Sequence, residues 1–243
     1  MCAMQIVSLP ALAKLELGVM PLAAEALAPL AGMPTLRRLS LVRPLEGVPV
    51  SLVQLTAVQE ISYAPEKEDV EDLTAESDAL CVALPRALTT LSPDYIALPS
   101  HLLPALAMLE RLETLRISGG PPGDRDTAGL PLPAGSWLSS LRTLEAPWRV
   151  VGPSIGVLRS SAPRLETLAC TGWLAEGSRI PRELLHSFFD LLSTHPPLCY
   201  FSIAGLYHDS FQIDHHSELI RLCTRLLRQR PTIRFYPAPA KSL

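Results

Sequence analysis

The chain of 243 residues contains no asparagine, and aromatic and charged residues are scarce, at 5% and 19%. Without asparagine there is no acceptor for an N-linked glycan. The net charge of −3 provides no overall positive field that would attract nucleic acid or an anionic membrane. No apolar run approaches the ~20 residues that span a bilayer. We therefore expect neither a nucleic-acid partner nor a membrane association.

The five cysteines also exclude one class of protein. They are odd in number and widely separated, at Cys2, Cys81, Cys170, Cys199 and Cys223. Because none of them forms a C-x-x-C pair, the pattern favours buried, reduced thiols over a disulfide framework. Residues 1–17 have no basic segment ahead of their apolar stretch, so they make a poor secretory signal. We expect an intracellular protein, located in the cytoplasm or the nucleus.

Leucine is the abundant residue, with 45 copies, and it recurs in a short phrase of three apolar positions. Two residues separate the first position from the second, and one residue separates the second from the third. The phrase begins at Leu12, Leu36, Val58, Leu88, Leu112, Leu141, Leu165 and Leu198, and a degenerate copy holds Ile233 and Phe235. The alternation within each copy predicts a short strand with one buried face. Since one such strand buries too little surface, we expect the copies to stack in parallel.

The segments between the copies predict a second layer. Amphipathic patterns favour helices over residues 67–84, 100–110, 181–194 and 215–229. The stretch from Gly119 to Gly135 is rich in glycine and proline, which predicts an irregular segment. The fold class is therefore α/β.

The phrase resembles the leucine-rich-repeat family over nearly the whole chain. The copies that begin at Leu112, Leu141 and Leu165 read L-E-T-L, L-R-T-L and L-E-T-L. Variable spacing with helical connections is similar to ribonuclease-inhibitor-type and F-box-associated repeats. The resemblance implies one domain over residues 1–243, a curved leucine-rich-repeat solenoid of about eight repeats. Its parallel strands would lie on the concave face, with helices and irregular segments on the convex face.

The chain departs from the family in two respects. The family often carries asparagine or cysteine three residues after the phrase, where this chain has Met20, Pro44, Glu66, Ile96, Gly120, Arg149, Trp173 and Leu206. The buried asparagine ladder is therefore absent, which predicts less regular turns. The first phrase begins at residue 12, so we expect the N-terminal edge to lack a polar cap.

The residues that alternate with the buried positions are predicted to face outward from the concave side. They are Lys14, Glu16, Arg38, Ser40, Glu60, Ser62, Thr90, Ser92, Thr114, Arg116, Thr143, Glu145, Thr167, Ala169, Tyr200 and Ser202. This small, hydroxylic set of mixed charge favours a protein partner, with Arg38, Arg116 and Tyr200 as anchors. Trp148 and Trp173 follow their strands, and core packing competes with an anchor role for both. The expected protein is a non-enzymatic binding module without cofactor or metal, a monomer or part of a complex.

Two alternative functions remain open. The resemblance to F-box-associated repeats implies the substrate-recognition part of a ubiquitin ligase. The stretch from Gly152 to Gly156 fits G-x-S-x-G, in which a hydrolase places its nucleophilic serine on a turn between strand and helix. Ser154 would be that nucleophile, and the structural alternative is that Ser154 caps a helix.

Three further groups of residues have both a functional and a structural interpretation. A metal site is one interpretation of His208, Asp214, His215, His216 and Glu218, and a polar loop leading into a helix is the other. Residues 66–78 carry seven acids and one lysine, either as a docking site or as a solvated helix face. The same choice applies to the basic side chains near the C-terminus, which are Arg221, Arg225, Arg228, Arg230 and Arg234.

Overall fold

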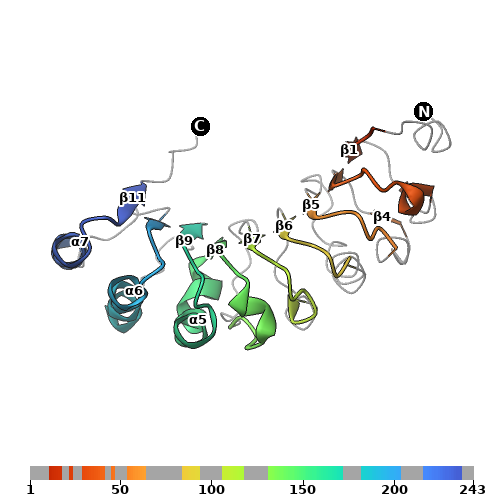
Figure 1. Ribbon diagram of the computed structural model, residues 1–243. Coiled ribbons are helices and arrows are strands. Elements are labelled where there is room, and N and C mark those ends of the chain that lie inside the picture. The colour runs from red at the N-terminus through yellow and green to blue at the C-terminus, as the bar shows by residue number, and fades with distance from the viewer. Residues whose placement is uncertain are drawn as a thin grey trace.

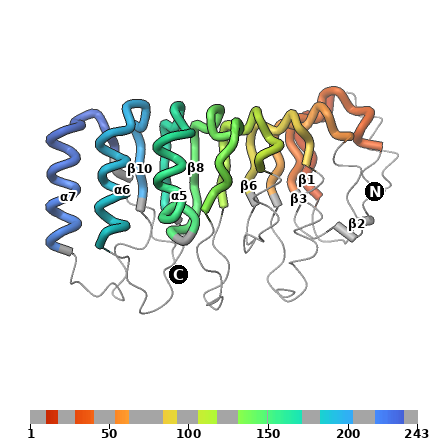
Figure 2. The backbone as a smooth tube through the Cα atoms, turned by 90° about the horizontal axis from the view of Figure 1, so that it is seen from below, coloured from red at the N-terminus to blue at the C-terminus, as the bar shows by residue number. Residues whose placement is uncertain are grey.

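The described part of the chain is an α/β structure built on one parallel sheet (Figures 1 and 2). This computed structural model describes residues 11–17, 22–23, 29–41, 45–46, 54–63, 84–93, 106–117, 131–171, 182–203 and 216–236. The sheet is open and curved, and in Figure 1 the helices lie on the outer side of the curve. The described strands form its inner side.

The nine strands of the sheet are adjacent in chain order and all of their pairings are parallel. They are β1 (Lys14–Leu17), β3 (Arg38–Leu41), β5 (Glu60–Tyr63), β6 (Thr90–Pro93), β7 (Thr114–Arg116), β8 (Thr143–Pro147), β9 (Thr167–Thr171), β10 (Tyr200–Ile203) and β11 (Arg234–Tyr236). Each copy of the apolar phrase gives one of these strands, so the strand prediction is confirmed. The sequence did not predict a second parallel pair, β2 (Leu22–Ala23) with β4 (Leu45–Glu46).

The first two apolar positions of the phrase form two buried columns along the sheet. At the first position no side chain from Leu36 to Leu198 is more than 1% exposed. The second position pairs in register from strand to strand and is at most 2% exposed, at Leu39, Ile61, Leu91, Leu115, Leu144, Leu168 and Phe201. Each buried leucine contributes about 1.5–3 kcal/mol before the entropy cost of ordering the chain. The two columns are therefore the main source of stability of the sheet.

A tight turn precedes each strand of the main sheet from β3 to β11, and it is closed by the backbone alone. The amide of the first apolar position donates to the carbonyl three residues earlier, as from Val58 to Leu55 at 3.0 Å and from Leu112 to Leu109 at 2.9 Å. Two successive amides then share one carbonyl of the preceding layer, as Thr89 and Thr90 do with Gln59 at 2.8 and 2.9 Å. These turns before the strands need no asparagine side chain. The positions where the family carries its asparagine follow the strands and, apart from Arg149, lie outside the described residues, so the irregularity predicted there stays a prediction.

Three α-helices are described, α5 (Trp148–Ser161), α6 (Arg182–Thr194) and α7 (His216–Gln229), together with the 3-10 helix η2 (Ser136–Ser139). The predictions for residues 181–194 and 215–229 are confirmed as α6 and α7. The predicted helix over 67–84, and the greater part of that over 100–110, fall outside the described residues. Helix α5 is not among the amphipathic segments predicted, because Gly152, Pro153 and Gly156 all lower helix propensity. It begins at Trp148, ahead of the helix that a cap at Ser154 would start.

Helices α5 and α6 approach each other closely at a glycine. A Cβ atom at Gly152 would lie 2.7 Å from Leu184 Cδ2, so any larger residue would displace the Leu184 side chain. Next to this contact, the Trp148 and Phe188 rings pack with centroids 5.0 Å apart. Phe189 in turn packs edge-on against Phe201 of β10, at 6.3 Å. The low helix propensity of α5 is thus offset by its packing against α6.

Arg230 joins the last two layers of the structure. Its guanidinium donates to four carbonyls, those of Leu192, His195, Pro196 and Leu198, at 2.5–2.8 Å. These oxygens belong to the C-terminal end of α6 and the turn after it, where helix carbonyls lack intrahelical partners. The predicted basic surface therefore loses this residue to a structural role.

Replacing Arg230 with methionine should lower the free energy of unfolding by about 2–3 kcal/mol, because carbonyls bonded to a charged donor lose their partner. Arg228→Met is the matched control, since the Arg228 side chain is exposed on the last turn of α7, two residues before Arg230. Its effect should stay within about 0.5 kcal/mol. Urea unfolding followed by circular dichroism measures both, and equal effects would show that the Arg230 bonds contribute nothing.

Candidate functional site

The candidate site is the inner face of the sheet, defined as the residues predicted to alternate with the buried columns. The side chains of all sixteen are partly or fully exposed, so their outward orientation is confirmed. Parallel register aligns them in two rows across the strands. One row is Lys14, Arg38, Glu60, Thr90, Thr114, Thr143, Thr167 and Tyr200, and the other is Glu16, Ser40, Ser62, Ser92, Arg116, Glu145, Ala169 and Ser202. The face is thus a regular polar surface carried by the core beneath it.

Charged residues of the inner face are paired with one another. Arg38 Nε lies 2.9 Å from Glu60 Oε2 on the neighbouring strand. Arg116 Nε lies 3.5 Å from Glu145 Oε2 in the same way. The side chains are 37–63% exposed, so each pair contributes at most about 1 kcal/mol to stability. Their main effect is to remove any net field of one sign from the face.

The middle of the inner face carries hydroxyl groups instead of charges. Threonine occupies the first row on four successive strands, at Thr90, Thr114, Thr143 and Thr167. In the second row Ser62 Oγ donates to Ser40 Oγ at 3.0 Å. Hydroxyls both donate and accept, so this strip can bond to either kind of polar group.

Tyr200, the predicted aromatic anchor of the inner face, contacts a residue of the last strand. The guanidinium of Arg234 lies 5.8 Å from the centroid of the Tyr200 ring. Its Nη1 also donates to the phenolic oxygen at 3.3 Å. Arg234 was assigned to a separate basic group by sequence, and the structure places it against Tyr200 instead.

Trp148 does not lie on the inner face. Its side chain is 4% exposed and packs on Phe188 in the core, so the core interpretation is confirmed and the anchor interpretation is wrong. Trp173 lies outside the described residues. Within β9, Cys170 is fully buried, and burial raises the pKa of its thiol well above the ordinary value. Cys199 and Cys223 are also free thiols.

Ser154 lies in the interior of α5 and not on an exposed turn. Its side chain is fully buried. The hydroxyl donates to the carbonyl of Val150 at 2.5 Å and accepts a bond from the amide of Leu132 at 2.8 Å. Ser154 is therefore neither the nucleophile on a hydrolase turn nor the cap of a helix, and both expectations are wrong. Its hydroxyl instead ties the irregular segment at Leu132 to the middle of α5.

Glu218 is the one side chain of the predicted metal cluster that is described, and it lies among cations. Its carboxylate is within 2.5 Å of Arg221, 3.0 Å of His186 and 3.8 Å of Arg182. The hydrogen bond from Arg221 is the main reason that the pKa of Glu218 lies below its usual value. His208, Asp214 and His215 lie outside the described residues, as do the side chain of His216 and the acidic segment 66–78. Within the described residues, Glu218 therefore links α6 to α7.

No protein-family model matches the chain, and no curated protein matches it either. In the described part of the chain, no helix combines the length and the apolar character that crossing a bilayer requires.

His195 is a buried polar residue that the sequence pattern did not reveal. It occupies the carbonyl position of the turn before β10, where the corresponding turns carry Met33, Leu55 and Leu109. Its side chain is 5% exposed, and Nε2 has no partner among the described residues. Burial lowers the pKa of His195, and the charge of Arg230 acts in the same direction, against a backbone hydrogen bond with Ala162.

Replacing Ser154 with alanine should lower the free energy of unfolding by about 1–3 kcal/mol, because the buried amide of Leu132 loses its acceptor. A fluorophosphonate probe should not label the folded wild-type protein, since the hydroxyl is inaccessible. Chemical unfolding and probe labelling measure the two effects. Labelling of the wild type that disappears in the alanine variant would restore the hydrolase hypothesis.

His195 should make the fold sensitive to acid. Because the pKa of His195 is lower in the folded protein, the unfolded chain takes up its proton more readily as the pH falls toward and below about 6.5. The free energy of unfolding should therefore fall as the pH drops through this range. In His195→Leu this contribution disappears, so the variant should gain stability over wild type between about pH 8 and about pH 5.5. Urea unfolding at both values tests this, and a constant difference would contradict it.

Proposed function

We propose that the chain is a leucine-rich-repeat solenoid whose inner face binds another protein. The observation that supports this proposal is the in-register alignment of the strands, which turns every second residue of eight strands into one continuous polar surface. Repeat folds present such curved surfaces to their partners.

The charge pattern indicates what kind of surface the partner presents. Arg38 with Glu60 and Arg116 with Glu145 place a positive and a negative group side by side. A strongly acidic or strongly basic partner would be repelled by half of these groups. The partner surface that fits is a polar one of mixed charge, with hydrogen-bonding groups opposite the threonine strip.

The anchors are already ordered before a partner arrives. Arg38 and Arg116 are held by carboxylates, and Tyr200 is held by Arg234. Side chains that are ordered in advance lose less conformational entropy on binding, which favours affinity. Aromatic and arginine side chains in such positions are typical centres of binding energy.

The decisive experiment compares proteins captured from a cell lysate by wild type and by the triple variant Arg38→Ala, Arg116→Ala and Tyr200→Ala. Quantitative mass spectrometry should show specific proteins retained by wild type and lost by the triple variant. Because each exposed ion pair contributes little to stability, the triple variant should remain folded, as circular dichroism would show.

The control variant is Arg111→Ala with Arg164→Ala, which removes two exposed arginines from the turns before β7 and β9. It should retain the captured proteins, and each purified partner should bind the triple variant at least about tenfold more weakly. Capture that is equal for all three baits, or absent for wild type, would exclude the inner face as the binding surface.

A further inference from the structure

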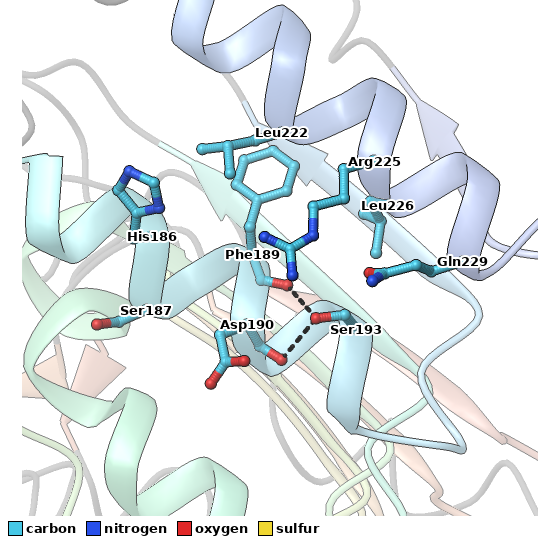
Figure 3. Close-up of a pocket in the computed structure, with 9 residues that line it drawn as sticks. All are labelled: His186, Ser187, Phe189, Asp190, Ser193, Leu222, Arg225, Leu226 and Gln229. Atoms are coloured by element: carbon cyan, nitrogen blue, oxygen red, sulfur yellow. Dashed lines mark hydrogen bonds between the residues drawn. The ribbon is translucent and has the colours of Figure 1, made fainter.

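A groove separates α6 from α7 on the outer side of the sheet (Figure 3). Its volume is 340 Å³. The apolar residues lining it are Phe189, Leu222 and Leu226, which are at most 5% exposed. The polar residues lining it are His186, Ser187, Asp190, Ser193, Arg225 and Gln229. An apolar base with a cation among its polar residues is the usual composition of a site that binds one charged and one apolar group.

We propose that this groove binds an acidic peptide segment, in which one carboxylate pairs with Arg225 and an adjacent apolar side chain covers Leu222 and Leu226. The proposal does not rest on the protein-binding role of the inner face, since the two surfaces lie on opposite sides of the sheet (Figure 1).

Arg225 is the available cation of the groove. The neighbouring arginines are engaged, Arg221 with Glu218 at 2.5 Å and Arg159 with Asp190 at 2.5 Å. Arg225 has neither an ion pair nor a hydrogen bond with any described residue. Figure 3 shows its side chain extending from α7 toward α6. A guanidinium in this position presents a flat pair of donors, which matches the two oxygens of a carboxylate.

The charges around the groove favour a carboxylate over a phosphate. One unpaired guanidinium balances one negative charge, whereas a phosphorylated residue carries nearly two and is usually bound by several arginines. Asp190 lines the same groove, and its carboxylate lies 2.5 Å from Arg159 Nη2. A dianion would therefore meet one cation and one acid, and a monoanion is the better match.

The open shape of the groove favours a segment of a protein over an enclosed small molecule. Its volume of 340 Å³ lies at the lower end of the range of about 300–1,000 Å³ that ligand sites span, which is room for a few side chains. It is open along two helices, and a peptide backbone can pass over it. Gln229, one turn beyond Arg225 on α7, lines the groove and offers an amide to such a backbone.

The test is selection of a phage-displayed library of random dodecapeptides against the immobilised whole chain. Sequencing should show enrichment of Asp or Glu next to Leu, Ile or Phe. The same selection against Arg225→Gln should lose this enrichment, and synthetic peptides of the enriched sequences should bind that variant at least about tenfold more weakly. Wild-type affinity should fall as salt is added, since the contact is an ion pair.

Arg228→Gln is the matched control, because it removes an exposed arginine from the same helix without touching the groove. It should retain the enrichment and the affinity. Enrichment that survives in Arg225→Gln, or that shows no acidic preference, would overturn the proposal. Tighter binding of a peptide with phosphoserine in place of the acid would overturn the assignment to a carboxylate. The inner-face triple variant should bind the peptides as wild type does, which separates this result from the test of the inner face.

Discussion

Burial of one apolar side chain per strand, in register with its neighbours, is the constraint on which the other features of this molecule depend. Leu115, Leu144 and Leu168 are fully buried because each has a strand on both sides. Leu15, on the edge strand β1, remains partly exposed although its sequence context is the same. The stability of a layer therefore comes from the layers beside it.

The same register separates the core from the surface that a partner would meet. Because alternate side chains of a strand point to opposite faces, residues of the inner face can differ without disturbing the leucine columns. Arg38 with Glu60 and Arg116 with Glu145 use this freedom to form pairs across strands. The turns between layers do not restrict the inner-face sequence either. They are joined by hydrogen bonds to backbone carbonyls such as that of Gln59, which need no particular side chain.

Several residues of the C-terminal layers that suggest chemistry serve to join elements. Ser154 ties the segment at Leu132 to α5, Arg230 bonds the end of α6, and Glu218 links α6 to α7. Each of these side chains is already bonded to other parts of the protein, whereas a functional role would require it to be free. Arg225 differs from them, because it lines a groove and none of the described residues pairs with it.

The sequence alone determined the α/β class, the position of every strand of the main sheet, and the outward orientation of the inner face. These properties follow from the spacing of apolar residues within each short segment, which can be read without knowing the rest of the fold. Tertiary structure decided the rest. It imposed a helix on Gly152 and Pro153, buried Ser154 and His195, paired Arg234 with Tyr200, and left Arg225 unpaired. Each of these outcomes depends on contacts between residues of different layers, far apart in the chain, and no local pattern records such contacts.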